Sequence, residues 1–312
     1  MTQRRPFLTA LAAGVLATLA ALPVFARCEG IAPEQRPQNT PREFIGETLD
    51  EILDRGSLTI AVYEDFPPYS WQDGAEPKGV DIELGRILAE GLGVTPEFRF
   101  VQAGETIQTD LMVNIWRGGV QKEPVANVML RVPYNSTLTC LIDQVVFTGQ
   151  YADEQIAIAY RQDAYPDAVP NPAGGRDEGG PVAAFFRFDT VAVENDSIAD
   201  FYLTSFPGGQ IGPMIRRHRT MADSMAALAV GETMAAMGPL AQLEFGAGQG
   251  VNVHEPPLPG FALSRWTLGI AVHVSHRDLA YALDDTVVAA LGDGRLQAAY
   301  AKYGLSFLPP QR

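Results

Sequence analysis

Three short segments hold the side chains best suited to contact a ligand. Aromatic rings supply flat apolar walls, an arginine guanidinium can clamp a carboxylate with two parallel hydrogen bonds, and Asn or Asp side chains fix polar groups. The candidates for such contacts are Phe66, Tyr69, Trp71, Arg131, Tyr134, Asn135 and Asp196. A cleft with such walls would bind a small molecule or a peptide segment, and the residue types are compatible with both.

The sequence shows no constellation for catalysis. It has no nucleophile elbow, no glycine loop that would cradle a phosphate, and no histidine paired with cysteine or serine at a meaningful spacing. The four histidines form no close-spaced ligand set with the cysteines, and His273 and His276, at a strand end, are expected to be exposed. We therefore predict a protein that is not an enzyme and holds neither a metal nor a cofactor.

The elements around the aromatic loop predict where its rings lie. Leu58–Val62 is a compact apolar run typical of a strand, and an amphipathic helix follows from Val80 to Leu92. Between them, Pro67 and Pro68 forbid strand or helix continuation. The aromatics are thus held at the carboxyl end of a strand, where open α/β sheets bind ligands. The competing interpretation is that they pack locally and only cap the sheet.

The rest of the chain alternates between strand and helix patterns. Further strands are expected at residues 97–101, 126–131, 144–147, 153–160, 191–193, 233–237 and 266–272. Further helices are expected at residues 44–55, 221–231 and 239–245. Residues 162–181 are rich in Pro, Gly and Asp, which predicts a solvent-exposed loop with little core.

The N-terminus has the pattern of an export signal. Arg4 and Arg5 precede an apolar stretch over residues 7–23, and Val24-Phe25-Ala26 fits a signal peptidase site. We predict a signal peptide over residues 1–26, cleaved after Ala26, and a loose leader over 27–44. The alternative is a membrane anchor, and the route of export, Sec or twin-arginine, stays open. The cleavage signal at Ala26 predicts a periplasmic mature chain. No later segment is apolar enough to span a membrane, so we expect no membrane span in the mature chain. We also expect a monomer, because no heptad pattern or apolar stripe suited to dimerisation occurs.

Composition and charge narrow the choice of partners. The 312 residues suggest two domains, and 46% hydrophobic with 19% charged residues is ordinary globular composition. A formal net charge of −14 repels phosphate backbones, so no nucleic acid partner is expected. Cys28 and Cys140 are the two cysteines, and in an oxidising compartment they either pair or stay reduced, since spacing alone fixes no geometry.

Several stretches together resemble the family 3 extracellular solute-binding proteins. They are residues 56–118, Phe147–Tyr151, Trp266–Val272, Asp293-Gly294 and Lys302–Gly304. The resemblance implies an α/β fold of the type II periplasmic binding kind, with two lobes, two crossover strands and an interlobe cleft. Lobe 1 would then span residues 45–154 and 267–312, and lobe 2 residues 155–266.

The chain departs from relatives that capture amino acids. Those relatives use an arginine to hold the ligand carboxylate, and its place here falls at Leu138 or Thr139. Their acidic contact to the ligand amine corresponds to Met234, so neither anchor is present. Arg131 could compensate from earlier in the loop, or be a lobe-surface charge. Losing two charged hydrogen bonds removes roughly 3 to 6 kcal/mol, or about two to four decades of affinity.

Residues 110–118 and 127–133 resemble a subgroup associated with pyrroloquinoline quinone alcohol and methanol dehydrogenases. That resemblance implies a non-catalytic accessory protein whose partner is the dehydrogenase or its cytochrome, although Asn127 stands where the subgroup has aspartate. The runner-up is a receptor that presents a small polar solute, such as an amino acid or organic acid, to an ABC permease. The third reading is a dehydratase on the same fold.

Overall fold

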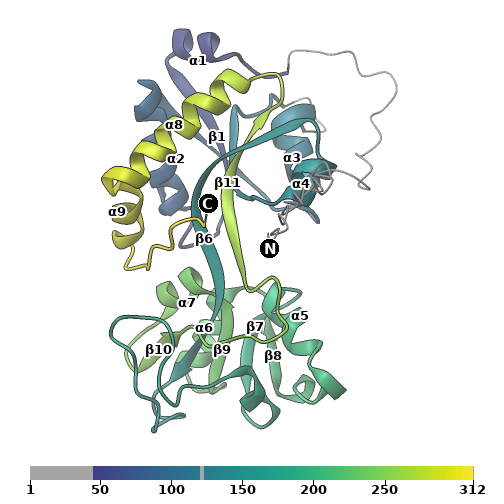
Figure 1. The fold of residues 1–312 in the computed structure, drawn as a ribbon, viewed down its shortest axis with the longest axis vertical. Coiled ribbons are helices and arrows are strands. Elements are labelled where there is room, and N and C mark those ends of the chain that lie inside the picture. Colours follow the sequence, from purple (N-terminus) through teal and green to yellow (C-terminus); the bar gives the residue numbers. More distant parts are fainter. Residues whose placement is uncertain (1–44, 120–122, 312) are drawn as a thin grey trace, which may run out of the picture.

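The chain folds into two lobes joined by two long strands. The computed structural model describes residues 45–119 and 123–311. Strands β6 (Val145–Arg161) and β11 (Arg265–His273) run from one lobe to the other (Figure 1). The predicted signal peptide, the leader and Cys28 lie outside the described residues, so cleavage and the pairing of Cys28 with Cys140 stay predictions.

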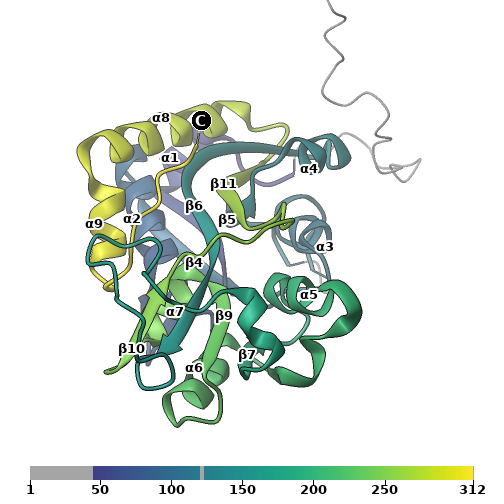
Figure 2. The same cartoon turned by 60° about the horizontal axis from the view of Figure 1, so that its bottom comes forward.

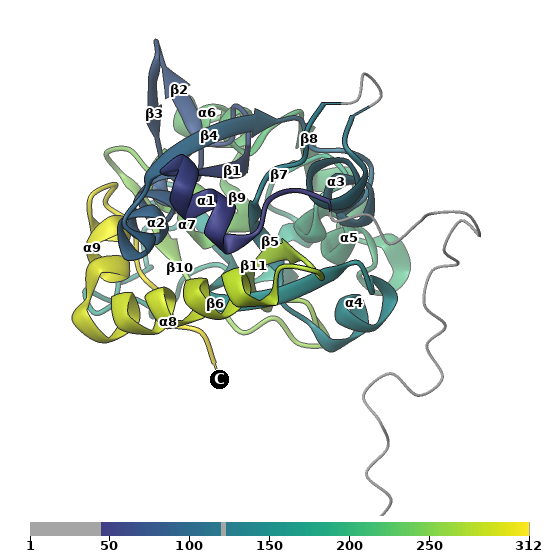
Figure 3. The ribbon, with the colours of Figure 1, turned by 90° about the horizontal axis from the view of Figure 1, so that it is seen from above.

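Lobe 1 is a five-stranded sheet in the order β4-β1-β5-β11-β6 with helices on both faces. Strand β1 pairs in parallel with β4 and β5, and β11 lies antiparallel between β5 and β6. Figure 3 shows α8 lying along this lobe and the small β2–β3 hairpin projecting from it. Its other elements are α1 (Leu49–Arg55), β1 (Ser57–Tyr63), β2 (Trp71–Asp73), β3 (Glu76–Lys78), α2 (Val80–Leu92), β4 (Thr95–Val101), α3 (Ile107–Leu111), the π-helical turn η1 (Met112–Arg117), β5 (Val128–Pro133), α4 (Ser136–Leu141), α8 (Arg277–Asp293) and α9 (Arg295–Ala301).

Lobe 2 continues the same hydrogen-bonded path in the order β6-β9-β7-β8, with β10 on the other side of β6. Figure 2 brings this lobe forward and shows α5, α6 and α7 around its sheet. Its elements are the 3-10 turns η2 (Ala183–Arg187), η3 (Pro207–Gly209) and η4 (Gly212–Met214), then β7 (Val191–Glu194), α5 (Ile198–Thr204), β8 (Ile215–His218), α6 (Met221–Ala229), β9 (Ala235–Pro239), α7 (Leu240–Gly246) and β10 (Val251–His254).

Strand β6 serves both lobes. Its first part pairs with β11 as far as Gln155, and from Ile156 onward it pairs with β9 and β10. The prediction of two separate strands at 144–147 and 153–160 is therefore wrong, because the ladder partners change along one continuous strand of 17 residues. The change of partner lies close to the predicted lobe boundary at residues 154–155, and the boundary itself stays a prediction.

Each lobe has its own apolar core. In lobe 1, Ile60, Leu88 and Leu283 are fully buried between the sheet and helices α2 and α8. In lobe 2, Ile158 and Phe186 belong to a separate buried cluster. The two cores meet where Trp266 of β11 packs against both, and β6 and β11 carry the chain between them. Lobes with separate cores joined by two strands can move relative to one another around a hinge.

The turn from the aromatic loop into α2 requires glycine. Gly79 precedes α2 with φ 122°, a conformation that side chains rarely adopt. A Cβ at this position would lie 2.0 Å from the carbonyl oxygen of Tyr69. The close approach lets Val80 N–H donate to the Pro68 carbonyl and Asp81 N–H donate to the Tyr69 carbonyl, which fixes the loop against the start of α2.

Two sequence expectations about exposure are wrong. The segment 162–181 contributes core residues, because Asp177 is buried and accepts hydrogen bonds from the Tyr160 hydroxyl and the Asn171 N–H. His273 and His276 are 6% and 4% exposed, packed at the end of β11, where the His273 ring lies against Ser275. His276 Nε2 lies 2.7 Å from the carbonyl oxygen of Ile45, a contact with a distant segment that strand alternation alone cannot show.

No helix within residues 45–119 and 123–311 is both long and apolar enough to span a bilayer.

Candidate functional site

The aromatic loop packs largely on itself. Phe66 forms a tight turn in which its N–H donates to the Ser70 carbonyl at 2.8 Å, and the Ser70 N–H donates back at 3.0 Å. The Phe66 ring lies 6.1 Å from the Tyr63 ring and 4.9 Å from the Tyr69 ring. Phe66 is half-buried and Tyr69 is 1% exposed. Of the two rings, Phe66 alone keeps a surface that a ligand could touch.

Arg131 lies at the centre of a buried charged cluster. Its Nε and Nη2 donate to the two carboxylate oxygens of Asp81 at 2.8 and 3.2 Å. Its Nη1 lies 3.6 Å from Glu154 Oε2, and its Cζ lies 3.3 Å from the centre of the Tyr69 ring. The Tyr69 hydroxyl donates to Glu154 Oε2 at 2.6 Å. All three guanidinium nitrogens face internal carboxylates, so no edge remains for a ligand carboxylate.

Burial and charge oppose each other in this cluster. Burial raises the pKa of Asp81 and of Glu154, and Arg131 acts against that rise in both. Burial acts to lower the pKa of Arg131, but the Asp81 carboxylate and the surrounding tyrosines together outweigh it, so the pKa lies well above the ordinary value. Arg131 also has φ +59°, which is rare for a residue with a long side chain. We infer that the ion pairs hold this backbone in place.

Trp71 contacts both lobes. Its ring lies 5.5 Å from Tyr303, which follows α9 in lobe 1, and 5.6 Å from Phe245 of α7 in lobe 2. The side chain is half-buried and leaves an edge in solvent. Trp71 therefore bridges the lobes on the side of the molecule that carries α7 and α9.

The other three predicted residues lie apart from this cluster. Asn135 is exposed and its Oδ1 accepts the Leu138 N–H at 2.7 Å, so it caps α4. Asp196 is exposed in lobe 2 with φ +57°, and its carboxylate accepts from the side chain of Asn195. Tyr134 is half-buried beside β11, where its N–H donates to the Thr267 carbonyl. The structure brings together Phe66, Tyr69 and Arg131, and does not join the others to them.

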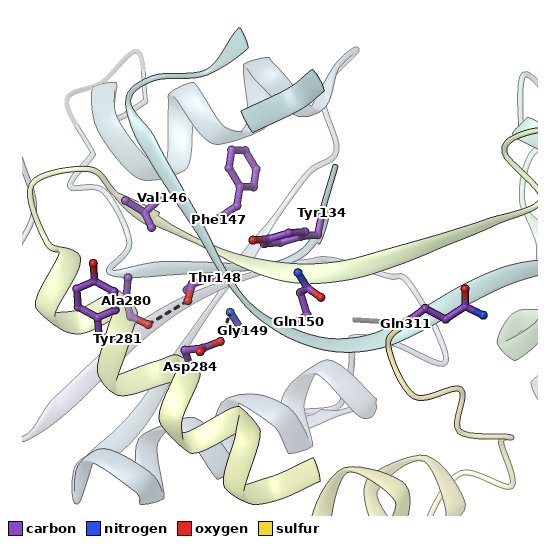
Figure 4. A pocket seen from close by; sticks show the side chains of 10 residues that line it. All are labelled: Tyr134, Val146, Phe147, Thr148, Gly149, Gln150, Ala280, Tyr281, Asp284 and Gln311. Carbon is purple, nitrogen blue, oxygen red and sulfur yellow. Dashed lines mark hydrogen bonds between the residues drawn. The ribbon is translucent and has the colours of Figure 1, made fainter. Parts of the chain in front are cut away.

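Tyr134 lines an open pocket of about 450 Å³ on the flank of the hinge. Figure 4 shows it between β6, α8 and the segment that ends at Gln311. Asp284 lies in its floor and accepts the Gly149 N–H at 3.1 Å, while the Thr148 hydroxyl donates to the Ala280 carbonyl. The walls are mixed polar and aromatic, and the pocket lies away from the Arg131 cluster.

Sequence reasoning missed Asp81 and Glu154. Asp81 stands between Val80 and Ile82 on the buried face of α2, and Glu154 lies in a strand where its neighbours are buried. An acid inside an apolar pattern is a signal that a cation must lie nearby, since a buried charge without a partner is costly. That signal could have directed attention to Arg131 as an internal partner.

Comparisons with known proteins agree with this architecture. Residues 58–112 match the model for bacterial extracellular solute-binding proteins, family 3. No curated protein matches the chain.

Solved structures share the arrangement of both lobes. The chain is similar to an ancestral cationic amino acid solute-binding protein, with TM-score 0.63 and 21% identity over 82% of this chain and 98% of that one. It is also similar to an amino acid ABC transporter substrate-binding protein from Streptococcus pneumoniae bound to L-arginine, with TM-score 0.58 and 14% identity over 84% and 100%. A third is an ancestral amino acid-binding protein described as a precursor of cyclohexadienyl dehydratase, with TM-score 0.56 and 19% identity over 82% and 98%. The chain has the two-lobed fold of the periplasmic binding proteins, and part of its first lobe matches the family 3 solute-binding model.

Proposed function

We propose that this chain is a periplasmic solute-binding protein of family 3 that captures a small polar solute and presents it to an ABC permease. The observation that carries the proposal is the hinge: two lobes of a binding-protein fold connect through β6 and β11. The family 3 match over residues 58–112, within lobe 1, supports it. Proteins of similar structure are described as a cationic amino acid solute-binding protein and an amino acid ABC transporter substrate-binding protein. The proposal assigns no catalytic role to any residue.

The ligand we propose is not held by the usual carboxylate clamp. Leu138 is buried in α4, and the Thr139 hydroxyl donates to the Asn135 carbonyl, so neither offers a cation. Arg131 is neutralised by Asp81 and Glu154. A solute held by Phe66, Trp71 and neutral hydrogen-bonding groups fits the described residues better than a free amino acid does.

We expect common L-amino acids to bind no tighter than about millimolar, because both charged anchors are absent. Calorimetry across amino acids and small organic acids measures this directly. For any solute that binds, Trp71→Ala should weaken affinity about tenfold or more through lost ring contact. Phe188→Ala removes a ring that is 82% exposed and serves as the control, with unchanged affinity. A micromolar dissociation constant for an amino acid would contradict the ligand assignment.

The second candidate is an accessory protein of a quinoprotein alcohol or methanol dehydrogenase. One observation favours it: Asp81 and Glu154 pair with the guanidinium of Arg131, which leaves the aromatic side chains of Phe66 and Trp71 without a free cation beside them. Partly exposed aromatic surface of that kind suits a peptide segment of a partner. The similar structures favour the transport reading over this one.

A pull-down with a quinoprotein dehydrogenase and its cytochrome tests the second candidate. We expect capture by the full chain, and reduced capture by the paired variants Trp71→Ala and Tyr134→Ala, if the aromatic residues form the contact surface. Full capture and unchanged dehydrogenase activity with both folded variants would exclude these aromatic residues as that surface. No capture by the unaltered chain would leave solute transport as the proposal.

A further inference from the structure

We propose that residues 305–311, which we call the strap, fix the two lobes against one another, so that the hinge opens only when the strap detaches. Figure 1 shows this segment leaving α9 and returning to the two crossing strands, where the chain is marked C. The strap is thus a third connection between the lobes. This inference does not depend on which solute or partner the protein binds.

Polar contacts tie the strap to lobe 2 and to the hinge. The Ser306 N–H and hydroxyl donate to the two carboxylate oxygens of Glu244 in α7, at 2.8 and 2.6 Å. The Asp153 N–H of β6 donates to the Leu308 carbonyl at 2.8 Å. Arg265 of β11 pairs with the Asp153 carboxylate at 2.7 Å and reaches the Pro309 carbonyl at 3.5 Å. Both crossing strands therefore contact the strap.

Apolar contacts of successive strap residues go to opposite lobes. Leu305 is buried in the lobe 1 core, and the Phe307 ring packs 5.2 Å from Tyr300 of α9. Leu308 packs against a lobe 2 cluster that includes Leu240 and Leu243 of α7. Because an extended chain directs alternate side chains to opposite sides, one short segment can hold two lobes at once.

A second contact closes the same side of the molecule. Phe245, adjacent to Glu244 in α7, meets the Trp71 ring of lobe 1, and Trp71 also meets Tyr303 just before the strap. Helix α7 is therefore held twice, by a hydrogen-bonded carboxylate and by an aromatic ring. Rotating lobe 2 away from lobe 1 would break both contacts together with the strap contacts.

The partial burial of Glu244 increases the contribution of its hydrogen bonds with Ser306 to the stability of the interlobe contact. Burial raises the pKa of Glu244, and the two bonds from Ser306 act in the opposite direction, favouring the ionised form. Hydrogen bonds to a charged group are stronger than neutral ones, and a partly buried carboxylate that loses them is disfavoured. Detachment of the strap therefore carries a free-energy cost that favours the arrangement of the two lobes seen in this structure.

The test compares the intact protein with a variant that lacks residues 306–312 and with the double variant Ser306→Ala/Leu308→Ala. We expect both to show a larger radius of gyration by small-angle X-ray scattering. We also expect amide hydrogen exchange in β9 and α7 of lobe 2 to become at least about tenfold faster. In the part of the chain that the structure describes, the strap makes no hydrogen bond to these backbone amides. The double variant keeps the chain length and carries the test if the truncated protein does not fold.

Gln311→Ala is the matched control. Gln311 is an exposed strap residue that makes no hydrogen bond to lobe 2 among the described contacts, so scattering and exchange should match those of the intact protein. Scattering and exchange of the double variant equal to those of the intact protein would overturn the strap proposal. If calorimetry finds no solute that binds, the proposed function is contradicted. The scattering and exchange measurements need no solute, so that result leaves the test of the strap unaffected.

Discussion

Arg131→Ala is expected to reduce the free energy of unfolding by about 3 to 5 kcal/mol, the largest loss for any single substitution considered. The substitution leaves Asp81 and Glu154 buried at 2% and 3% exposure without their cation. An uncompensated buried carboxylate costs far more than the lost bonds themselves, and Tyr69 also loses the guanidinium stacked on its ring. Urea denaturation followed by circular dichroism measures the change.

Two further variants make the Arg131 result specific. Arg216→Ala removes an exposed arginine bonded only to backbone carbonyls, and should change stability by less than about 0.5 kcal/mol. Arg131→Lys keeps a charge but cannot span both oxygens of Asp81, so most of the loss should remain. A loss below about 1 kcal/mol for Arg131→Ala would show that the cluster is hydrated rather than buried.

Acidification from pH 6.5 to about pH 4 is expected to remove roughly 3 kcal/mol of stability through His273. Burial, with a smaller contribution from the neighbouring His276, lowers the pKa of His273 from 6.5 to about 4. The unfolded chain therefore binds a proton between these pH values that the folded chain does not. Stability contributed by the neutral ring is full above pH 6.5 and falls as the pH drops toward 4. Burial also lowers the pKa of His254, which adds to the loss.

The His273 effect must be measured as a difference, because several carboxylates act with the opposite sign. Burial raises the pKa of Asp81, Glu154, Glu194 and Glu244, so the folded chain holds their protons more firmly and gains stability as pH falls. Denaturation curves at several pH values for the intact protein and for His273→Gln separate the contribution of His273 from that of the carboxylates. The variant should lose less stability than the intact protein between pH 6.5 and 4. Parallel pH profiles would mean that His273 is hydrated and titrates normally.

Local pattern was enough to place most regular elements. The apolar run at Leu58–Val62 and the helix from Val80 to Leu92 match β1 and α2 because period and capping are properties of neighbouring residues. The strand that returns to lobe 1 was predicted at 266–272 and observed at Arg265–His273. The predicted aromatic loop also forms, with Phe66 and Tyr69 in contact.

The same local reasoning identified residue types correctly while leaving their roles open. Arg131, Trp71 and Asn135 were all candidates for ligand contact. In the structure Arg131 pairs internally, Trp71 bridges the lobes and Asn135 caps a helix. Their part in binding a solute stays a prediction.

The sequence by itself determined most of the strands and helices, because hydrophobic period and turn residues act over a few positions. The two-lobed fold class came from the resemblance to family 3 solute-binding proteins. Only the tertiary structure decided the partners of the charged and aromatic side chains. Arg131 meets Asp81 across 50 residues of chain, and Ser306 meets Glu244 across 62. Such pairings depend on how the sheets and helices pack, and nothing in the local pattern distinguishes an arginine that awaits a ligand from one already neutralised by buried carboxylates.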